Sequence, residues 1–104
     1  MSGHELTSQL AERVMGWKAM PTRFVRPDNS WMPRWKFEPL VNTTHAVFLL
    51  EHSGAENYSI SKLHDRYTTH VTIRGKVGAA EGQLKSRTIA LAVAHAVGLE
   101  TEGV

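Results

Sequence analysis

The sequence predicts an α+β domain in which three helices pack around one antiparallel β-hairpin. The stretch Asn57–Arg74 is the only one that alternates clearly between apolar and polar residues, as a half-buried strand does. Two other stretches, 2–15 and 86–97, carry apolar residues at helical spacing. The chain has 104 residues, of which 41% are hydrophobic and 21% charged. These values are typical of one folded domain, and we expect it to span residues 1–104.

The predicted hairpin has one face toward the core and one face outward. In the second strand, the residues expected to face the core are Tyr67, Thr69, Val71 and Ile73. The residues expected to face outward are Thr68, His70, Thr72 and Arg74. In the first strand Tyr58 and Ile60 share a face, and the turn is expected at residues 64–66.

The first and last helices have recognisable ends. Ser2 can cap the first helix, with Glu5 three residues on, and Gly16 can end it. Ser86 is expected to cap a final helix over 87–97, with Gly98 ending it. The alanines of that helix would let its axis approach a neighbour closely. Residues 100–104 are expected to form a solvated tail.

Three segments lie between these elements. Residues 18–39 contain all four prolines, which favours a long loop, with Arg34–Phe37 as a candidate third, short edge strand. Residues 42–52 could form a buried strand or a helix; Asn42 as N-cap favours the helix. The glycine-rich residues 75–83 are expected to form a flexible connector.

Charge and composition exclude several classes of protein. The net charge is +2, which permits an anionic partner without requiring one. The chain has no Cys and hence no disulfide framework, and a reducing cytoplasm is compatible with this. No apolar run approaches the roughly 20 residues that span a bilayer, and the N-terminus lacks the apolar core of a signal peptide. We therefore expect no membrane partner.

Two short motifs resemble a known family. The nine residues 10–18, LAERVMGWK, resemble the opening of the phage ABA-sandwich domain family, in which a helix ends in Val-Met-Gly-Trp. Phe37-x-Pro39 with the later His45-Ala46 is similar to the second family signature, although Val47 takes the place of a Trp. The resemblance implies a phage or prophage origin and a small three-layer α-β-α sandwich, with helices on both faces of the sheet. It implies no functional residue, because the family has no agreed biochemical role.

The segment 18–39 holds the first candidate ligand site. It combines cationic and aromatic side chains, namely Arg23, Arg26, Trp31, Arg34, Trp35 and Lys36. Guanidinium groups pair with phosphate, and an indole stacks on a base. The commoner alternative is that the tryptophans fill the core while the arginines stay in water.

The second candidate site is the polar face of the hairpin, with Arg66, His70 and Arg74. A solvated sheet face has the same composition. If helices cover both faces, as the resemblance implies, these side chains must instead find partners within a layer or a subunit boundary.

No catalytic motif is present. The six histidines lack metal-ligand spacing, and the glycines of 75–83 match neither the dinucleotide fingerprint nor the P-loop. We therefore expect no enzyme activity, no cofactor and no metal.

The resulting hypothesis is a non-enzymatic binding protein of phage type, acting in the host cytoplasm. Its first form is a counter-defence sponge for an anionic nucleotide-derived immune signal, such as a cyclic nucleotide or an ADP-ribose derivative. The alternatives are an inhibitor that binds a host protein and a nucleic-acid-binding accessory protein; the charge of +2 argues against the latter. Unfilled apolar faces on so small a domain also predict a homo-oligomer.

Overall fold

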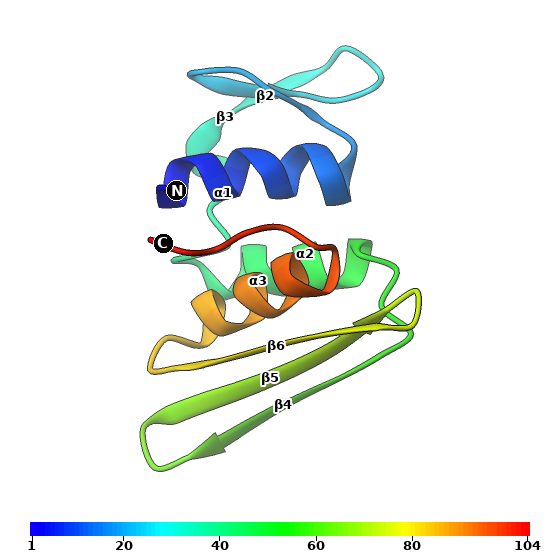
Figure 1. Cartoon of the computed structure of the whole chain (residues 1–104). Coiled ribbons are helices and arrows are strands. Elements are labelled where there is room, and N and C mark those ends of the chain that lie inside the picture. Colours follow the sequence, from blue (N-terminus) through cyan, green and yellow to red (C-terminus); the bar gives the residue numbers. More distant parts are fainter.

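A computed structural model describes all 104 residues and places three helices between two antiparallel sheets of three strands each. The helices are α1 (Gly3–Leu10), α2 (Thr43–His52) and α3 (Lys85–Ala96). The small sheet contains β1 (Lys18–Ala19), β2 (Arg23–Val25) and β3 (Trp31–Pro33). The large sheet contains β4 (Asn57–Leu63), β5 (Arg66–Ile73) and β6 (Lys76–Gly82). In Figure 1 the two sheets lie at opposite ends of the molecule.

The α+β class is confirmed, whereas the α-β-α order of layers is not seen in the single chain. α1 lies under the small sheet, and α2 and α3 lie between α1 and the large sheet (Figure 1). The outer face of the large sheet is open: Ser59, His70 and Ala79 on its three strands are all exposed. Helices therefore cover one face of this sheet instead of two.

The first helix begins as predicted and continues as a wider turn. The Ser2 Oγ accepts a hydrogen bond from the Glu5 N–H at 3.1 Å. After α1 the chain makes a π-helical turn over Ala11–Met15, and Gly16, with φ of 73°, ends it. Trp17 then packs in the core against Phe24 and Phe37, with ring centroids 6.0 and 5.2 Å away.

The proline-rich segment is a folded sheet instead of an open loop. Phe24 in β2 pairs with Met32 in β3, and both side chains are buried. The prediction of an edge strand over Arg34–Phe37 was wrong, because Arg34–Lys36 form a 3₁₀ turn directly after β3. The strands lie earlier: Pro21 and Pro27 fall outside them, and Pro33 is the last residue of the edge strand β3.

The middle segment is helical, as its cap predicted. The Asn42 Oδ1 accepts a hydrogen bond from the His45 N–H at 3.0 Å at the start of α2. Leu49 and Leu50 are buried in the common core.

The predicted hairpin is present, and the predicted faces hold within β5 but not for Arg74, which lies past the end of the strand and turns to the helix side. β4 and β5 pair through a turn at His64–Asp65, and Thr69, Val71 and Ile73 are buried. The prediction of a flexible connector over 75–83 was wrong, because residues 76–82 form the third strand, β6. Gly and Ala have low strand propensity, so the sequence pattern did not reveal this strand.

The strand β6 consists of small residues because α3 lies directly on it. A Cβ at Gly78 would lie 2.0 Å from the Ala92 carbonyl oxygen and 2.4 Å from the Ala96 nitrogen. The alanines of α3 that this contact requires are fully or almost fully buried, namely Ala90, Ala92, Ala94 and Ala96. The predicted close approach of this helix is therefore confirmed.

The ends of α3 differ in part from the prediction. The helix ends before Gly98, which has φ of 81°, as predicted. Ser86 does not cap the helix, because it lies inside the first turn and its Oγ donates to the Leu40 carbonyl at 3.2 Å. The tail is not simply solvated: it returns between α1 and α3 (Figure 1), and the Thr101 hydroxyl bonds His95 Nε2 at 2.7 Å.

Replacing Gly78 should separate α3 from the sheet. We expect Gly78→Ala to lower the free energy of unfolding by at least about 2 kcal/mol, because the added methyl group meets helix backbone that cannot rotate away. Urea unfolding measures this change.

Gly82→Ala is the matched control, since a Cβ there lies 3.5 Å from Thr88 Cγ2, an ordinary contact. Equal stability of the two variants would contradict the close approach of α3 at Gly78.

Candidate functional site

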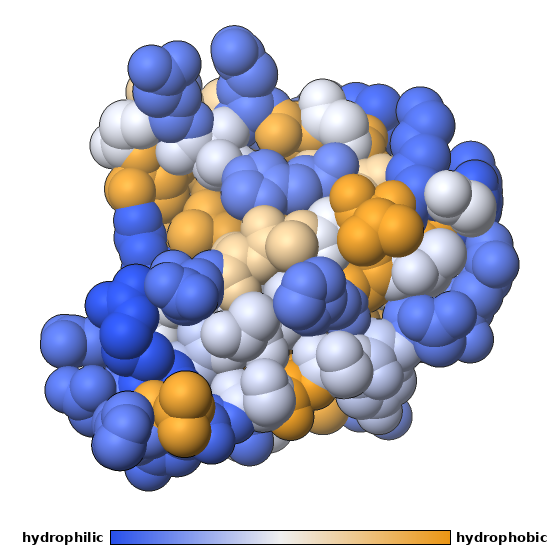
Figure 2. Space-filling model, turned by 60° about the horizontal axis from the view of Figure 1, so that its bottom comes forward, coloured by the Kyte–Doolittle hydropathy of each residue, from blue (hydrophilic) through white to orange (hydrophobic).

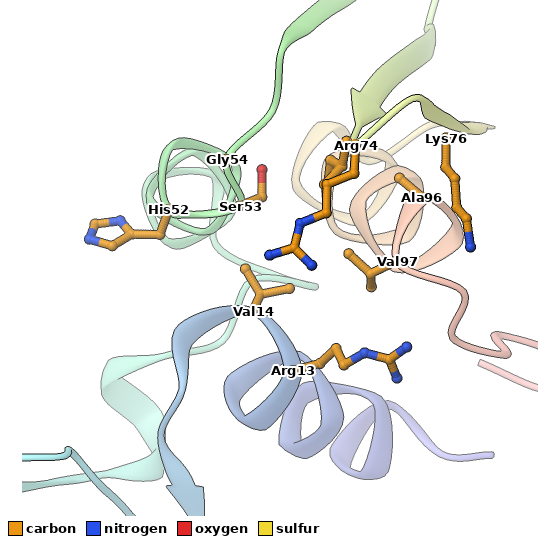
Figure 3. Close-up of a pocket in the computed structure, with 10 residues that line it drawn as sticks. Arg13, Val14, His52, Ser53, Gly54, Arg74, Lys76, Ala96 and Val97 are labelled. Carbon is orange, nitrogen blue, oxygen red and sulfur yellow. The ribbon is translucent and has the colours of Figure 1, made fainter.

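A cavity of about 390 Å³ lies where the large sheet meets the ends of the helices. It is lined by the π-helical turn, the end of α2, the β5–β6 turn and the end of α3 (Figure 3). The lining residues are Arg13, Val14, His52, Ser53, Gly54, Ile73, Arg74, Lys76, Ala96 and Val97. This volume is within the range of about 300–1,000 Å³ that small-molecule sites have.

Three cationic side chains enter this cavity from separate elements. Arg13 comes from the π-helical turn, Arg74 from the β5–β6 turn and Lys76 from the start of β6. In Figure 3 the Arg74 guanidinium points into the space between Val14 and Val97, Arg13 runs below Val97, and Lys76 lies on the far side of α3. No carboxylate lines the cavity, and the one ion pair in the structure joins Arg66 to Glu81 elsewhere. None of the three cations therefore forms an ion pair with an acidic side chain.

The turn that presents Arg74 is held in an unusual backbone conformation. Arg74 has φ of 51° and is followed by Gly75 with φ of 77°. Two residues with positive φ are typical of a tight hairpin turn. The Gly75 N–H donates to the Glu56 carboxylate at 2.9 Å, which fixes the turn against the start of β4. Arg74 is thereby directed into the cavity instead of along the sheet.

The same cations also lie near helix carboxyl ends. The π-helical turn, α2 and α3 all end at this cavity, and a helix carboxyl end carries partial negative charge. Those ends favour nearby cations and so help to hold them in place. His52 contributes little to the opening, because its ring points away from it (Figure 3) and its Nδ1 donates to the Phe48 carbonyl at 3.0 Å.

The Arg and Trp residues between positions 17 and 36 divide into buried and exposed groups. Trp17 is in the core, which agrees with the commoner alternative of the sequence analysis. Trp31 and Trp35 are instead 58% and 65% exposed. The Arg23 guanidinium lies over the Trp31 ring at 5.4 Å, and the Lys36 ammonium over the Trp35 ring at 5.5 Å.

Arg34 and Arg26 are engaged within the fold. Arg34 donates to the carbonyls of Met20 and His4, both at 3.1 Å, and to the Ser8 Oγ at 2.8 Å. Burial lowers the pKa of the Arg34 guanidinium from its ordinary value. Arg26 donates to the Ser30 Oγ at 3.1 Å and lies 5.8 Å from the Trp17 ring. Neither side chain has the free guanidinium group that a phosphate site would use.

The β2–β3 turn is shaped by a carboxylate. The Asp28 Oδ1 accepts hydrogen bonds from the Ser30 hydroxyl and the Ser30 N–H, at 2.5 and 2.9 Å. These bonds lower the pKa of Asp28, which is exposed.

The residues proposed from sequence therefore do not form one site. The residues from 23 to 36 belong to the small sheet and its 3₁₀ turn, whereas Arg66, His70 and Arg74 belong to the large sheet at the opposite end (Figure 1). Arg66 pairs with Glu81 at 3.0 Å, and His70 lies on the open outer face. Of these residues only Arg74 reaches the cavity.

Sequence reasoning did not identify Arg13 and Lys76. About sixty residues separate them along the chain, and no local motif connects them. A cation just before a helix end, as at Arg13, is an ordinary feature. Only the packing of the π-helical turn against α2, beside the end of α3, makes it part of a site.

No group of three or more His, Cys, Asp or Glu residues gathers where it could hold a metal ion. None of the helices has the length and the apolar composition that crossing a membrane would require.

Loss of Arg34 should destabilise the fold. We expect Arg34→Ala to lower the free energy of unfolding by about 2 kcal/mol, because it leaves two backbone carbonyls and the Ser8 hydroxyl without their charged donor. Thermal and urea unfolding measure the change.

Arg23→Ala is the control, since this exposed side chain contacts an exposed ring, and we expect a change within about 0.5 kcal/mol. Wild-type stability of Arg34→Ala would show that the Arg34 contacts do not hold α1 to the small sheet.

Comparisons with known proteins bear on the fold. No family model matches the chain, and no curated protein matches it. The structure is similar to the 2.0 Å crystal structure of a phage protein from Bacillus cereus ATCC 14579, with a TM-score of 0.75 and 16% sequence identity. The match covers 98% of this chain and 93% of that chain. At this identity, the similarity establishes a shared fold.

Proposed function

We propose that this protein binds a small phosphate-bearing ligand in the cavity between Arg13, Arg74 and Lys76. The observation that supports the proposal is that three cationic residues without ion-pair partners line one cavity. Uncompensated cations close together repel one another, and a bound anion would relieve that repulsion.

The chemistry of the three side chains fits phosphate. A guanidinium can give two parallel hydrogen bonds to a phosphate, and an ammonium acts as a compact point charge beside it. No residue of the lining combines with another as nucleophile and base, because the cavity contains no carboxylate and His52 bonds the Phe48 carbonyl. The proposed role is therefore binding without catalysis.

The wider role that we propose is sequestration. The similarity to a phage protein of Bacillus cereus supports a phage-type origin for this chain, and hence the cytoplasm of a bacterial host as its place of action. A phage protein of this size with one anion site could act as a sponge that lowers the free concentration of a nucleotide-derived immune signal. The ligand class is then a cyclic nucleotide or an ADP-ribose derivative.

A second candidate function is binding to a host protein through the small sheet. Trp31 and Trp35 are exposed next to Arg23 and Lys36, and Trp and Arg are the residue types most enriched at interface hot spots. This surface lies apart from the cavity, so variants can separate the two functions.

Ligand binding can be measured by calorimetry and thermal shift. We expect one member of a panel of inorganic phosphate, pyrophosphate, ADP-ribose and cyclic dinucleotides to raise the melting temperature at ligand excess. Arg13→Gln and Arg74→Gln should each weaken that ligand about tenfold or more, because each removes a charged hydrogen-bond donor.

Arg23→Gln is the matched control, because it removes the same charge at the other end of the molecule. Unchanged affinity of the Arg13→Gln, Arg74→Gln double variant would disprove the assigned cavity. A panel without any binding member would favour the protein-binding alternative.

A further inference from the structure

The strand β4 is an open edge of the large sheet. The sheet order is β4-β5-β6, so one side of β4 pairs with β5 and the other side faces solvent. All residues of β4 except Ile60 are exposed. The strand contains no Pro and only one charged residue, Lys62. It therefore lacks most of the features that prevent an edge strand from pairing with another chain.

The opposite edge of the sheet is protected. The His95 Nδ1–H donates to the Ala79 carbonyl of β6 at 2.7 Å, so a side chain already occupies one acceptor of this strand. The Thr101 hydroxyl bonds the other nitrogen of the same ring at 2.7 Å, which brings the tail to this edge. A further strand can therefore pair with β4, whereas His95 and the tail lie in the way of a strand at β6.

The inner face of β4 is also unfilled. The close approach of α3 is to β6, where Gly78 lies under Ala92 and Ala96. Tyr58 on the same sheet face of β4 is 56% exposed, and Ile60 is only partly buried. Figure 2, which brings the outer side of the large sheet forward, shows isolated hydrophobic groups among polar ones there as well. An added strand would cover apolar surface as well as satisfy backbone groups.

We infer that the occupant of this edge is β4 of a second copy, paired antiparallel about a two-fold axis at Ile60. The sequence of the strand centre, Tyr58-Ser59-Ile60-Ser61-Lys62, reads nearly the same in both directions. When two copies of this strand pair antiparallel about its midpoint, each residue therefore lies opposite a residue of the same or a complementary type.

The side-chain pairs across this axis are favourable. Ile60 lies opposite Ile60 of the partner subunit, and Ser59 lies opposite Ser61 of the partner subunit. Tyr58 lies opposite Lys62 of the partner subunit, so an ammonium meets a ring face. Lys62 makes the same kind of contact within one chain, 5.5 Å from the Tyr67 ring. The two Lys62 charges lie at opposite ends of the paired segment and do not face each other.

The result is a continuous sheet of six strands in a closed dimer. Pairing of β4 with β6 of another copy would instead give an open filament, and the His95 contact obstructs that edge. The dimer uses neither the cavity nor the surface around Trp31 and Trp35, so it can be tested independently of the proposed function.

Sedimentation of the full chain tests the dimer. We expect about twice the chain mass of 11.6 kDa for wild type and the monomer mass for Ile60→Lys, in which two ammonium groups would meet at the axis. Ile60→Glu should also be monomeric, and an equimolar mixture of the two variants should restore the dimer through opposite charges.

Val77→Lys is the matched control, because it adds the same charge on the exposed outer face of β6, away from the axis. It should remain dimeric. Circular dichroism of each variant establishes that it is folded. A monomeric wild type, or a dimer that persists in folded Ile60→Lys, would overturn the inference.

Discussion

The contact on which the rest of the fold depends is the close approach of α3 to β6 at Gly78. The Ala92 carbonyl and the Ala96 backbone occupy the space of a side chain there. This distance requires small residues on both sides, which explains the alanines of α3 and the glycine and alanines of β6. It also leaves α3 buried on several sides: α2 packs on it, and the C-terminal tail lies between it and α1 (Figure 1).

That same composition explains which parts of the fold could be predicted from sequence. The caps at Ser2 and Asn42 and the alternation in β5 are local signals, and the structure contains all three features. The strand β6 was missed because residues chosen for close packing have low intrinsic strand propensity. The small sheet was missed because its strands have only two or three residues, too few to show a period.

The candidate site shows the same division between local and tertiary information. Arg74 could be named from sequence, but its direction depends on a tight turn fixed by Glu56. Arg34 looked like a ligand-binding residue because composition does not show that three acceptors would already engage it. Arg13 became part of a cavity only because helices distant in sequence end at one place. A charged residue can therefore be assigned to binding or to support only from its neighbours in space.

The three strands of the large sheet and α3 follow one another directly along the chain, which affects the order of folding. Residues 57–96 form β4, β5, β6 and α3 in direct succession, so their pairings join neighbouring segments and close short loops. Contacts between neighbouring segments form quickly. The apolar side chains of α1 can become buried only after α2 and α3 have folded. We expect this C-terminal unit to fold first, and the N-terminal helix with its small sheet to dock onto it afterwards. Substitutions in the unit, such as those at Gly78, would then slow folding, and substitutions at Arg34 would mainly speed unfolding.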